Sequence, residues 1–195
     1  MDRLANKLTD YCEVKNCIEP DKKEIYCYGF KLIIADLINF TLVIVLGALF
    51  NRLVSSVCFL VTLCGIRQFS GGYHSKSFWL CRLSMLITFS AVLGVSSFVA
   101  AVPYVWYVIL VINLVSVAII GILSPIRHPN KRLTEKQRKM NKIKSIILSS
   151  VLSVVSLVLA HFYLYEGVVV SITILSVTVL MIIGLINLKG GKKNV

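Results

Sequence analysis

The sequence lacks the short motifs that identify the common hydrolases and metal sites. It has no Cys-x-x-Cys pair among its six cysteines, no His-Glu-x-x-His element and no Gly-x-Ser-x-Gly element. With only three histidines in 195 residues, the spacings fit no zinc site, and we expect neither a metal nor another cofactor. An apolar signal-peptide core before Lys31 is also missing, so the first apolar segment is expected to act as its own membrane anchor.

Charged residues are scarce, and long apolar runs take their place. The chain is 57% hydrophobic and 15% charged, with a mean hydropathy of +0.82, which excludes an ordinary soluble domain. A membrane-spanning helix needs roughly 20 mostly apolar residues. Six runs qualify as candidate spans: 32–50, 53–66, 83–101, 104–123, 145–165 and 168–188. We therefore predict an all-α, polytopic integral membrane protein with about six transmembrane helices.

The second run is the weakest of the six. Its 14 residues reach only about 21 Å as a helix, less than the hydrocarbon core of a bilayer. It could extend through Phe69, tilt, or form a re-entrant segment. Whether it crosses the bilayer is left open by the sequence.

The predicted organisation has three parts. Residues 1–31 form a cytoplasmic amphipathic segment, with Leu4, Leu8 and Tyr11 at helical spacing, as in a helix that lies on a membrane surface. Residues 32–188 form the helical membrane domain, which contains a connection at 67–82 and a basic cytoplasmic loop at 124–144. Residues 189–195 form a cytoplasmic tail.

The basic residues indicate how the chain is oriented. Of the 21 Lys and Arg residues, all except Arg52 lie in the N-terminal segment, the 67–82 connection, the 124–144 loop or the tail. Six spans place these four regions on the same side, and the positive-inside rule assigns that side to the cytoplasm. The net charge of +12 then reflects topology and contact with lipid headgroups, and we expect no nucleic-acid partner. None of the cysteines is predicted to face the exterior, so structural disulfides are not expected.

The connection RQFSGGYHSKSFWLC is where polar, flexible and titratable residues meet between two apolar runs. It places His74 seven residues before Cys81. An imidazole that contacts a cysteine both removes the thiol proton and stabilises the thiolate. Both residues cannot lie in one straight helix and touch, because seven residues separate them by about 10.5 Å along the axis. A turn at Gly71-Gly72 and a helix that begins near Ser77 would let His74 fold back over Cys81.

The same residues have a simpler interpretation. A cysteine in a membrane helix often only fills space, and a histidine near an interface often only anchors the chain. Spacing alone leaves both interpretations open.

The pattern of Arg67, Gly71-Gly72, His74 and Cys81 resembles the signature of the AgrB family of bacterial accessory gene regulator proteins. The resemblance extends to chain length, the amphipathic N-terminus, the multiple spans and the basic loop in the second half. It implies a membrane cysteine endopeptidase that removes the C-terminal part of a small AgrD-like propeptide. It also implies help in closing the remainder into a thiolactone or lactone signal for quorum sensing.

The resemblance assigns roles to individual residues. It implies that His74 and Cys81 are catalytic, and that Arg67, Gly71 and Gly72 are structural or position the substrate. Basic residues of the later loop, often a lysine pair in the family, correspond to Lys131 and Arg132, which are structural, as orientation determinants, or position an acidic substrate. Arginine at the second of these positions retains the charge but not the shape of lysine.

A third group that orients His74 is less evident. Asp36 is a candidate, although it also suits an interfacial carboxylate or a partner for Lys31. Asn39 and Gln68 are further candidates. Another class of function is also open, a small membrane peptide transporter without covalent catalysis, and so is a scaffold in which the pair only packs.

The expected partners are the AgrD-like propeptide, membrane lipids and a second copy of the chain. The resemblance implies the propeptide, and the apolar spans imply the lipids. Small residues at Gly47, Gly94 and Gly121 could support a homodimer, although packing within one chain explains them equally well.

Overall fold

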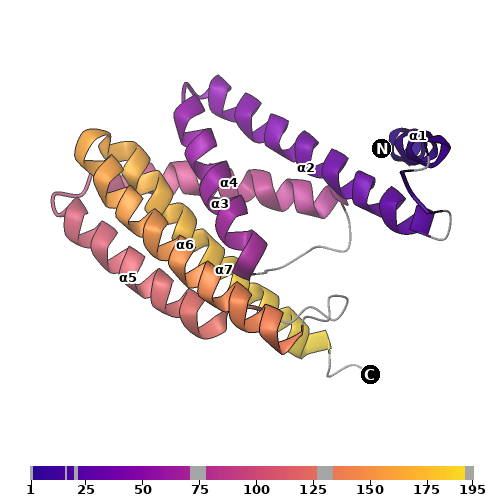
Figure 1. The fold of residues 1–195 in the computed structure, drawn as a ribbon. Helices are drawn as coiled ribbons and strands as arrows, with labels where there is room; N and C mark the ends of the chain where they lie inside the picture. The colour runs from indigo at the N-terminus through magenta and orange to yellow at the C-terminus, as the bar shows by residue number, and fades with distance from the viewer. Residues whose placement is uncertain (1, 16, 20–21, 71–77, 127–133, 192–195) are drawn as a thin grey trace. The chain divides into compact units, whose positions relative to one another are not determined.

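In the part of the chain that it describes, the computed structural model consists of helices joined by short connections. It describes all residues except 1, 16, 20–21, 71–77, 127–133 and 192–195. The helices are α1 (Asp2–Val14), α2 (Lys23–Leu49), α3 (Leu53–Ser70), α4 (Phe78–Ala100), α5 (Val105–Leu123), α6 (Glu135–Phe162) and α7 (Leu164–Gly191) (Figure 1). Among the described residues there is no strand. The predicted all-α class is confirmed.

Six of these helices, α2 to α7, are long and apolar enough to cross a membrane. The chain is therefore a multi-pass membrane protein. The second span is longer than its apolar run, because α3 continues through Arg67 to Ser70. Its 18 residues rise about 27 Å, close to the thickness of the hydrocarbon core.

The chain divides into two compact units, residues 1–46 and 47–195. In the first, ion pairs join α1 to the beginning of α2. Lys23 Nζ lies 2.8 Å from the Asp10 carboxylate and 2.6 Å from that of Glu13, and Lys31 lies 2.8 Å from Asp2. The Lys31 ammonium lowers the pKa of Asp2 below its usual value. The predicted helix at the N-terminus is confirmed, with Leu4, Leu8 and Tyr11 on an exposed side.

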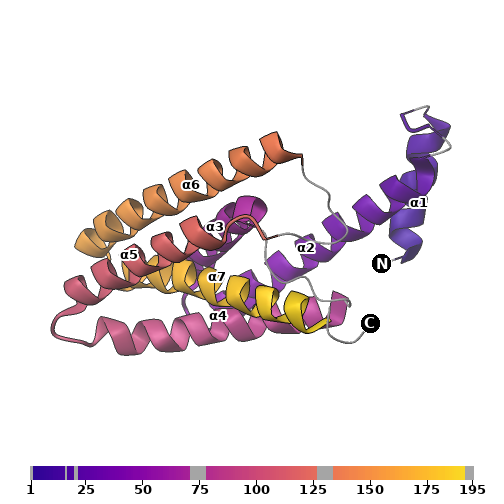
Figure 2. The same cartoon turned by 90° about the horizontal axis from the view of Figure 1, so that it is seen from below.

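In the second unit, α7 is the central helix. It contacts α3, α4, α5 and α6, and over half of its apolar segment is buried. Figure 2 shows α7 running between α4 and α5. Side-chain hydrogen bonds tie the interior together, because Asn113 donates to Ser156 at 2.7 Å and Ser171 donates to the same hydroxyl at 3.1 Å. Such bonds join α5, α6 and α7 where lipid offers no competing partner.

The connections between helices place their ends in two groups. At one end of the second unit, which we call the connection end, lie the end of α3, the beginning of α4, the end of α5 and the beginning of α6. At the other, the hairpin end, lie the beginning of α3, the end of α4, the beginning of α5 and the α6–α7 turn. Tyr163 alone separates α6 from α7, and Gly167 lies directly against Ala160 in this hairpin.

The expected loop at 124–144 is partly helical, because α6 begins at Glu135. Thr134 caps the helix by accepting a hydrogen bond from the Gln137 amide at 3.3 Å, and the Gln137 side chain accepts one from the Thr134 amide at 3.1 Å. This Thr-x-x-Gln capping box is a start signal that apolar runs do not reveal.

Candidate functional site

Cys81 lies in the first turn of α4, where the sequence predicts the nucleophile. The helix begins at Phe78, so Cys81 is its fourth residue. The thiol is free and partly buried, and the Ser84 hydroxyl donates to the Cys81 carbonyl at 2.9 Å. The amides of a first helical turn carry partial positive charge, which suits a thiolate or an oxyanion.

The structure does not describe most of the other predicted site residues. His74, Gly71 and Gly72 lie outside the described residues, as do Lys131 and Arg132. Their roles stay predictions.

The 71–77 connection joins the end of α3 to the beginning of α4, three residues before Cys81. Ser70 ends α3 and Phe78 begins α4, both at the connection end. Arg67 lies in the last turn of α3, where a cation complements the helix dipole.

The basic loop begins beside this connection, which the sequence did not indicate. The Ile126 amide donates to the Ser70 carbonyl at 3.1 Å, and Ile126 is buried. The hydroxyls of Ser124 and Ser145 lie 2.6 Å apart and are buried between the end of α5 and α6. Lys144 on α6 lies over the Phe69 ring, 5.5 Å from its centroid. The segment that leads into the loop with Lys131 and Arg132 is therefore hydrogen-bonded to Ser70, the residue before Gly71.

Three basic residues lie at the connection end of the second unit, and one of them is next to Cys81 in the chain. Arg82, the next residue along α4, lies over the Trp79 ring at 5.2 Å, and its Nε is buried without a hydrogen-bond partner among the described residues. Lys144 and Arg67 belong to the same end of the unit. The sequence alone assigns no role to Arg82 or Lys144, although the position of Arg82 next to a motif residue is a signal that points to it. The arrangement suits an anionic peptide segment.

The proposed orienting groups are distributed differently. Gln68 is exposed on the last turn of α3, close in sequence to the connection. Asp36 and Asn39 lie on α2 within the first unit. Because that unit is separate from the one that contains Cys81, a pairing of Asp36 with His74 stays a prediction.

Comparison with known proteins identifies the chain's relatives. The model of the accessory gene regulator B family (AgrB) matches residues 1–185. The chain belongs to the AgrB family. FsrB of Enterococcus faecalis is 30% identical over 174 residues, which cover 85% of this chain and 70% of that protein. A putative AgrB-like protein 2 of Clostridium perfringens is 32% identical over 167 residues, which cover 81% and 76%. No solved structure matches this chain.

Family membership confirms the resemblance drawn from Arg67, Gly71-Gly72, His74 and Cys81. It connects this AgrB-family chain with accessory gene regulation in quorum sensing, and it implies an AgrD-like propeptide as partner. The chemistry performed on that partner is a separate question.

Proposed function

We propose that this AgrB-family chain is a cysteine endopeptidase that cleaves an AgrD-like propeptide and promotes its cyclisation. The observation that carries the proposal is the position of Cys81 in the first turn of α4, directly after the connection that contains His74. The cationic groups of the connection end support it, because they suit an acidic propeptide segment. The proposed orientation places this end, both termini and the basic loop in the cytoplasm.

In the proposed mechanism, His74 accepts the thiol proton of Cys81, and the thiolate attacks a propeptide carbonyl. The peptide bond breaks, His74 returns the proton to the departing amine, and a thioester joins the rest of the propeptide to Cys81. A cysteine or serine of the propeptide then attacks the thioester, which closes the ring and restores the Cys81 thiol. Exclusion of water by the surrounding apolar helices keeps the thioester from hydrolysis.

The test is co-expression with the cognate propeptide, followed by mass spectrometry of both proteins. We expect a released C-terminal fragment and, on Cys81, an adduct with the mass of the remaining propeptide that hydroxylamine removes. Fragment release without such an adduct would reject the thioester step but keep the peptidase. Uptake or export of the propeptide without cleavage would instead favour the transporter.

A second prediction concerns the basic loop. Replacing Lys131 and Arg132 together with alanine is expected to raise KM about tenfold and leave kcat within about twofold, because these charges attract the substrate rather than react with it. The measurement is propeptide cleavage in reconstituted vesicles at two salt concentrations. Higher salt should raise the KM of wild type more than the KM of the variant. A fall in kcat at unchanged KM would contradict a role in substrate attraction.

A further inference from the structure

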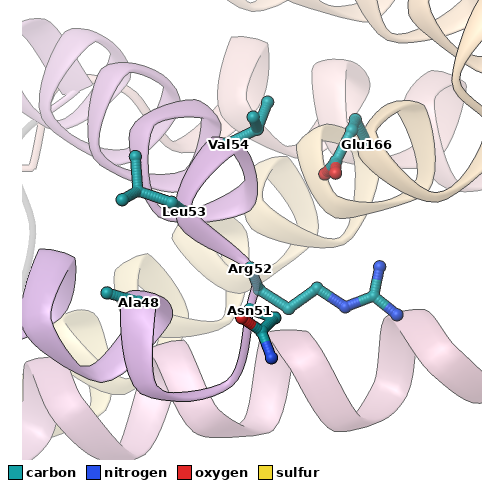
Figure 3. Close-up of a pocket in the computed structure, with 6 residues that line it drawn as sticks. All are labelled: Ala48, Asn51, Arg52, Leu53, Val54 and Glu166. Carbon is teal, nitrogen blue, oxygen red and sulfur yellow. The ribbon is translucent and has the colours of Figure 1, made fainter.

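The hairpin end carries very little charge, and the charge that it has is concentrated in one place. Arg52 and Glu166 are the only Lys, Arg, Asp or Glu residues in the ranges 48–54, 98–106 and 160–168. Both line the same pocket of about 300 Å³, together with Asn51 and the apolar residues Ala48, Leu53 and Val54 (Figure 3). This pocket lies at the opposite end of the second unit from Cys81.

Each of the two charges is held by a separate partner. The Arg52 guanidinium carbon lies 3.9 Å from the centroid of the Tyr165 ring, and the Tyr165 hydroxyl donates to the Leu93 carbonyl at 3.1 Å. The Glu166 carboxylate accepts a hydrogen bond from the Ser55 hydroxyl at 2.7 Å. In Figure 3 the carboxylate points from α7 toward α3.

No ion pair joins Arg52 to Glu166, although the structure describes both side chains. Opposite charges that serve only to fasten two helices gain most by direct contact. Here stacking and a hydrogen bond orient the charges while they remain apart across a hollow. This arrangement suits a ligand that carries both signs of charge.

The chain around the pocket is fixed by close backbone contacts. The Arg52 amide donates to the Gly47 carbonyl at 2.7 Å, and Asn51 adopts a left-handed conformation with φ of 54°. A Cβ on Gly47 would collide with the Ser56 hydroxyl and lie 3.1 Å from the Arg52 carbonyl, so a larger residue here requires Ser56 to move. The pocket is therefore largely preformed, which lowers the entropic cost of binding.

Exposed aromatic side chains locate this end at the membrane–water interface. They are Phe50, Tyr104, Trp106, Tyr107, Phe162 and Tyr163. Aromatic rings of this kind gather at the level of lipid headgroups. Leu53 and Val54, at the rim of the pocket, are 52% and 61% exposed and can contact acyl chains.

We propose that the Arg52–Glu166 pocket binds the headgroup of a zwitterionic phospholipid with a primary ammonium, such as phosphatidylethanolamine. The phosphate pairs with the guanidinium of Arg52, which can donate two parallel hydrogen bonds. The ammonium donates to the carboxylate of Glu166. A phosphatidylglycerol headgroup leaves Glu166 without a cation, and a choline headgroup has no N–H to donate.

The proposal is tested by native mass spectrometry of the full chain in detergent. The chain is offered equal amounts of phosphatidylethanolamine, phosphatidylglycerol and phosphatidylcholine with identical acyl chains. We expect wild type to retain phosphatidylethanolamine about tenfold over phosphatidylglycerol, the ratio that one charge-assisted hydrogen bond supplies. Arg52→Gln should retain about tenfold less of each of the three lipids than wild type does. Glu166→Gln should bring the ratio of retained phosphatidylethanolamine to phosphatidylglycerol near one.

The matched control is Arg3→Gln, which removes an exposed arginine charge of α1, in the first unit, and should leave the lipid pattern unchanged. Ser55→Ala gives a milder variant in case Glu166→Gln does not fold, and it should lower the preference about threefold because it frees the carboxylate to rotate. The same lipid pattern in Arg52→Gln, Glu166→Gln and wild type would overturn the proposal and leave the pair a contact of the fold. Displacement of bound phosphatidylethanolamine by a synthetic cyclic peptide would also overturn it, in favour of a peptide site.

Discussion

Replacing Cys81 with alanine is expected to reduce propeptide cleavage by at least about a thousandfold, because the variant lacks the thiol on which the proposed thioester forms. The measurement is release of the C-terminal fragment over time by wild type and variant in the same vesicles. Cys81→Ser should retain binding and lose most of the rate, since a hydroxyl is a far weaker nucleophile than a thiolate.

The control for this prediction is Cys58→Ala. Cys58 lies on α3 in the same unit and, like Cys81, is a partly buried free thiol. The sequence places it outside the motif, so its variant should cleave at the wild-type rate. Normal cleavage by Cys81→Ala would remove Cys81 as nucleophile, and with it the proposed peptidase mechanism.

The second large effect is expected at the hairpin of α6 and α7. Gly167→Ala should destabilise the chain by roughly 2–3 kcal/mol, because the added Cβ would meet the Ala160 backbone and Cβ. Backbone atoms cannot rotate aside as a side-chain end can, so the two helices must separate. Thermal unfolding of the detergent-solubilised protein, followed by its near-ultraviolet circular dichroism, measures the shift.

Gly94→Ala is the matched control for the hairpin. Gly94 lies inside α4, and a Cβ there meets no atom within 4 Å. The substitution should raise stability by about 0.5–1 kcal/mol, since alanine favours a helix more than glycine does. Equal destabilisation by both variants would mean that close packing at Gly167 is not what holds the hairpin.

The sequence was sufficient for the features that depend on composition and short-range pattern. Apolar runs longer than about 18 residues form helices in lipid, so five of the spans could be predicted directly, whereas the 14-residue run at 53–66 left its span open. The family could be assigned from the pattern of Arg67, Gly71-Gly72, His74 and Cys81. Helix ends were harder, because Arg67 to Ser70 and Glu135 to Lys144 are largely polar, and polar residues can continue a helix beyond the apolar run.

Contacts between distant segments could not be predicted in the same way. Nothing local to Ser70 or Ile126 indicates their hydrogen bond, which depends on how α3, α5 and α6 pack. The same holds for Arg52 and Glu166, which are 114 positions apart in sequence and meet at one pocket. For Gly47, Gly94 and Gly121 the sequence left two interpretations. In the structure Gly47 lies against Ser56 and Gly121 against Ile146, within the chain, and a homodimer stays a prediction.

The length of α6 has a consequence for how a substrate arrives. Its 28 residues extend about 42 Å, whereas the hydrocarbon core is about 30 Å thick. Its first turns are polar, so we expect the surplus to fall there and Lys136, Arg138, Lys139 and Lys142 to lie at the level of the headgroups. A propeptide that adheres to the membrane surface would reach these basic residues by lateral diffusion. Its search for the protein would then take place in two dimensions instead of three.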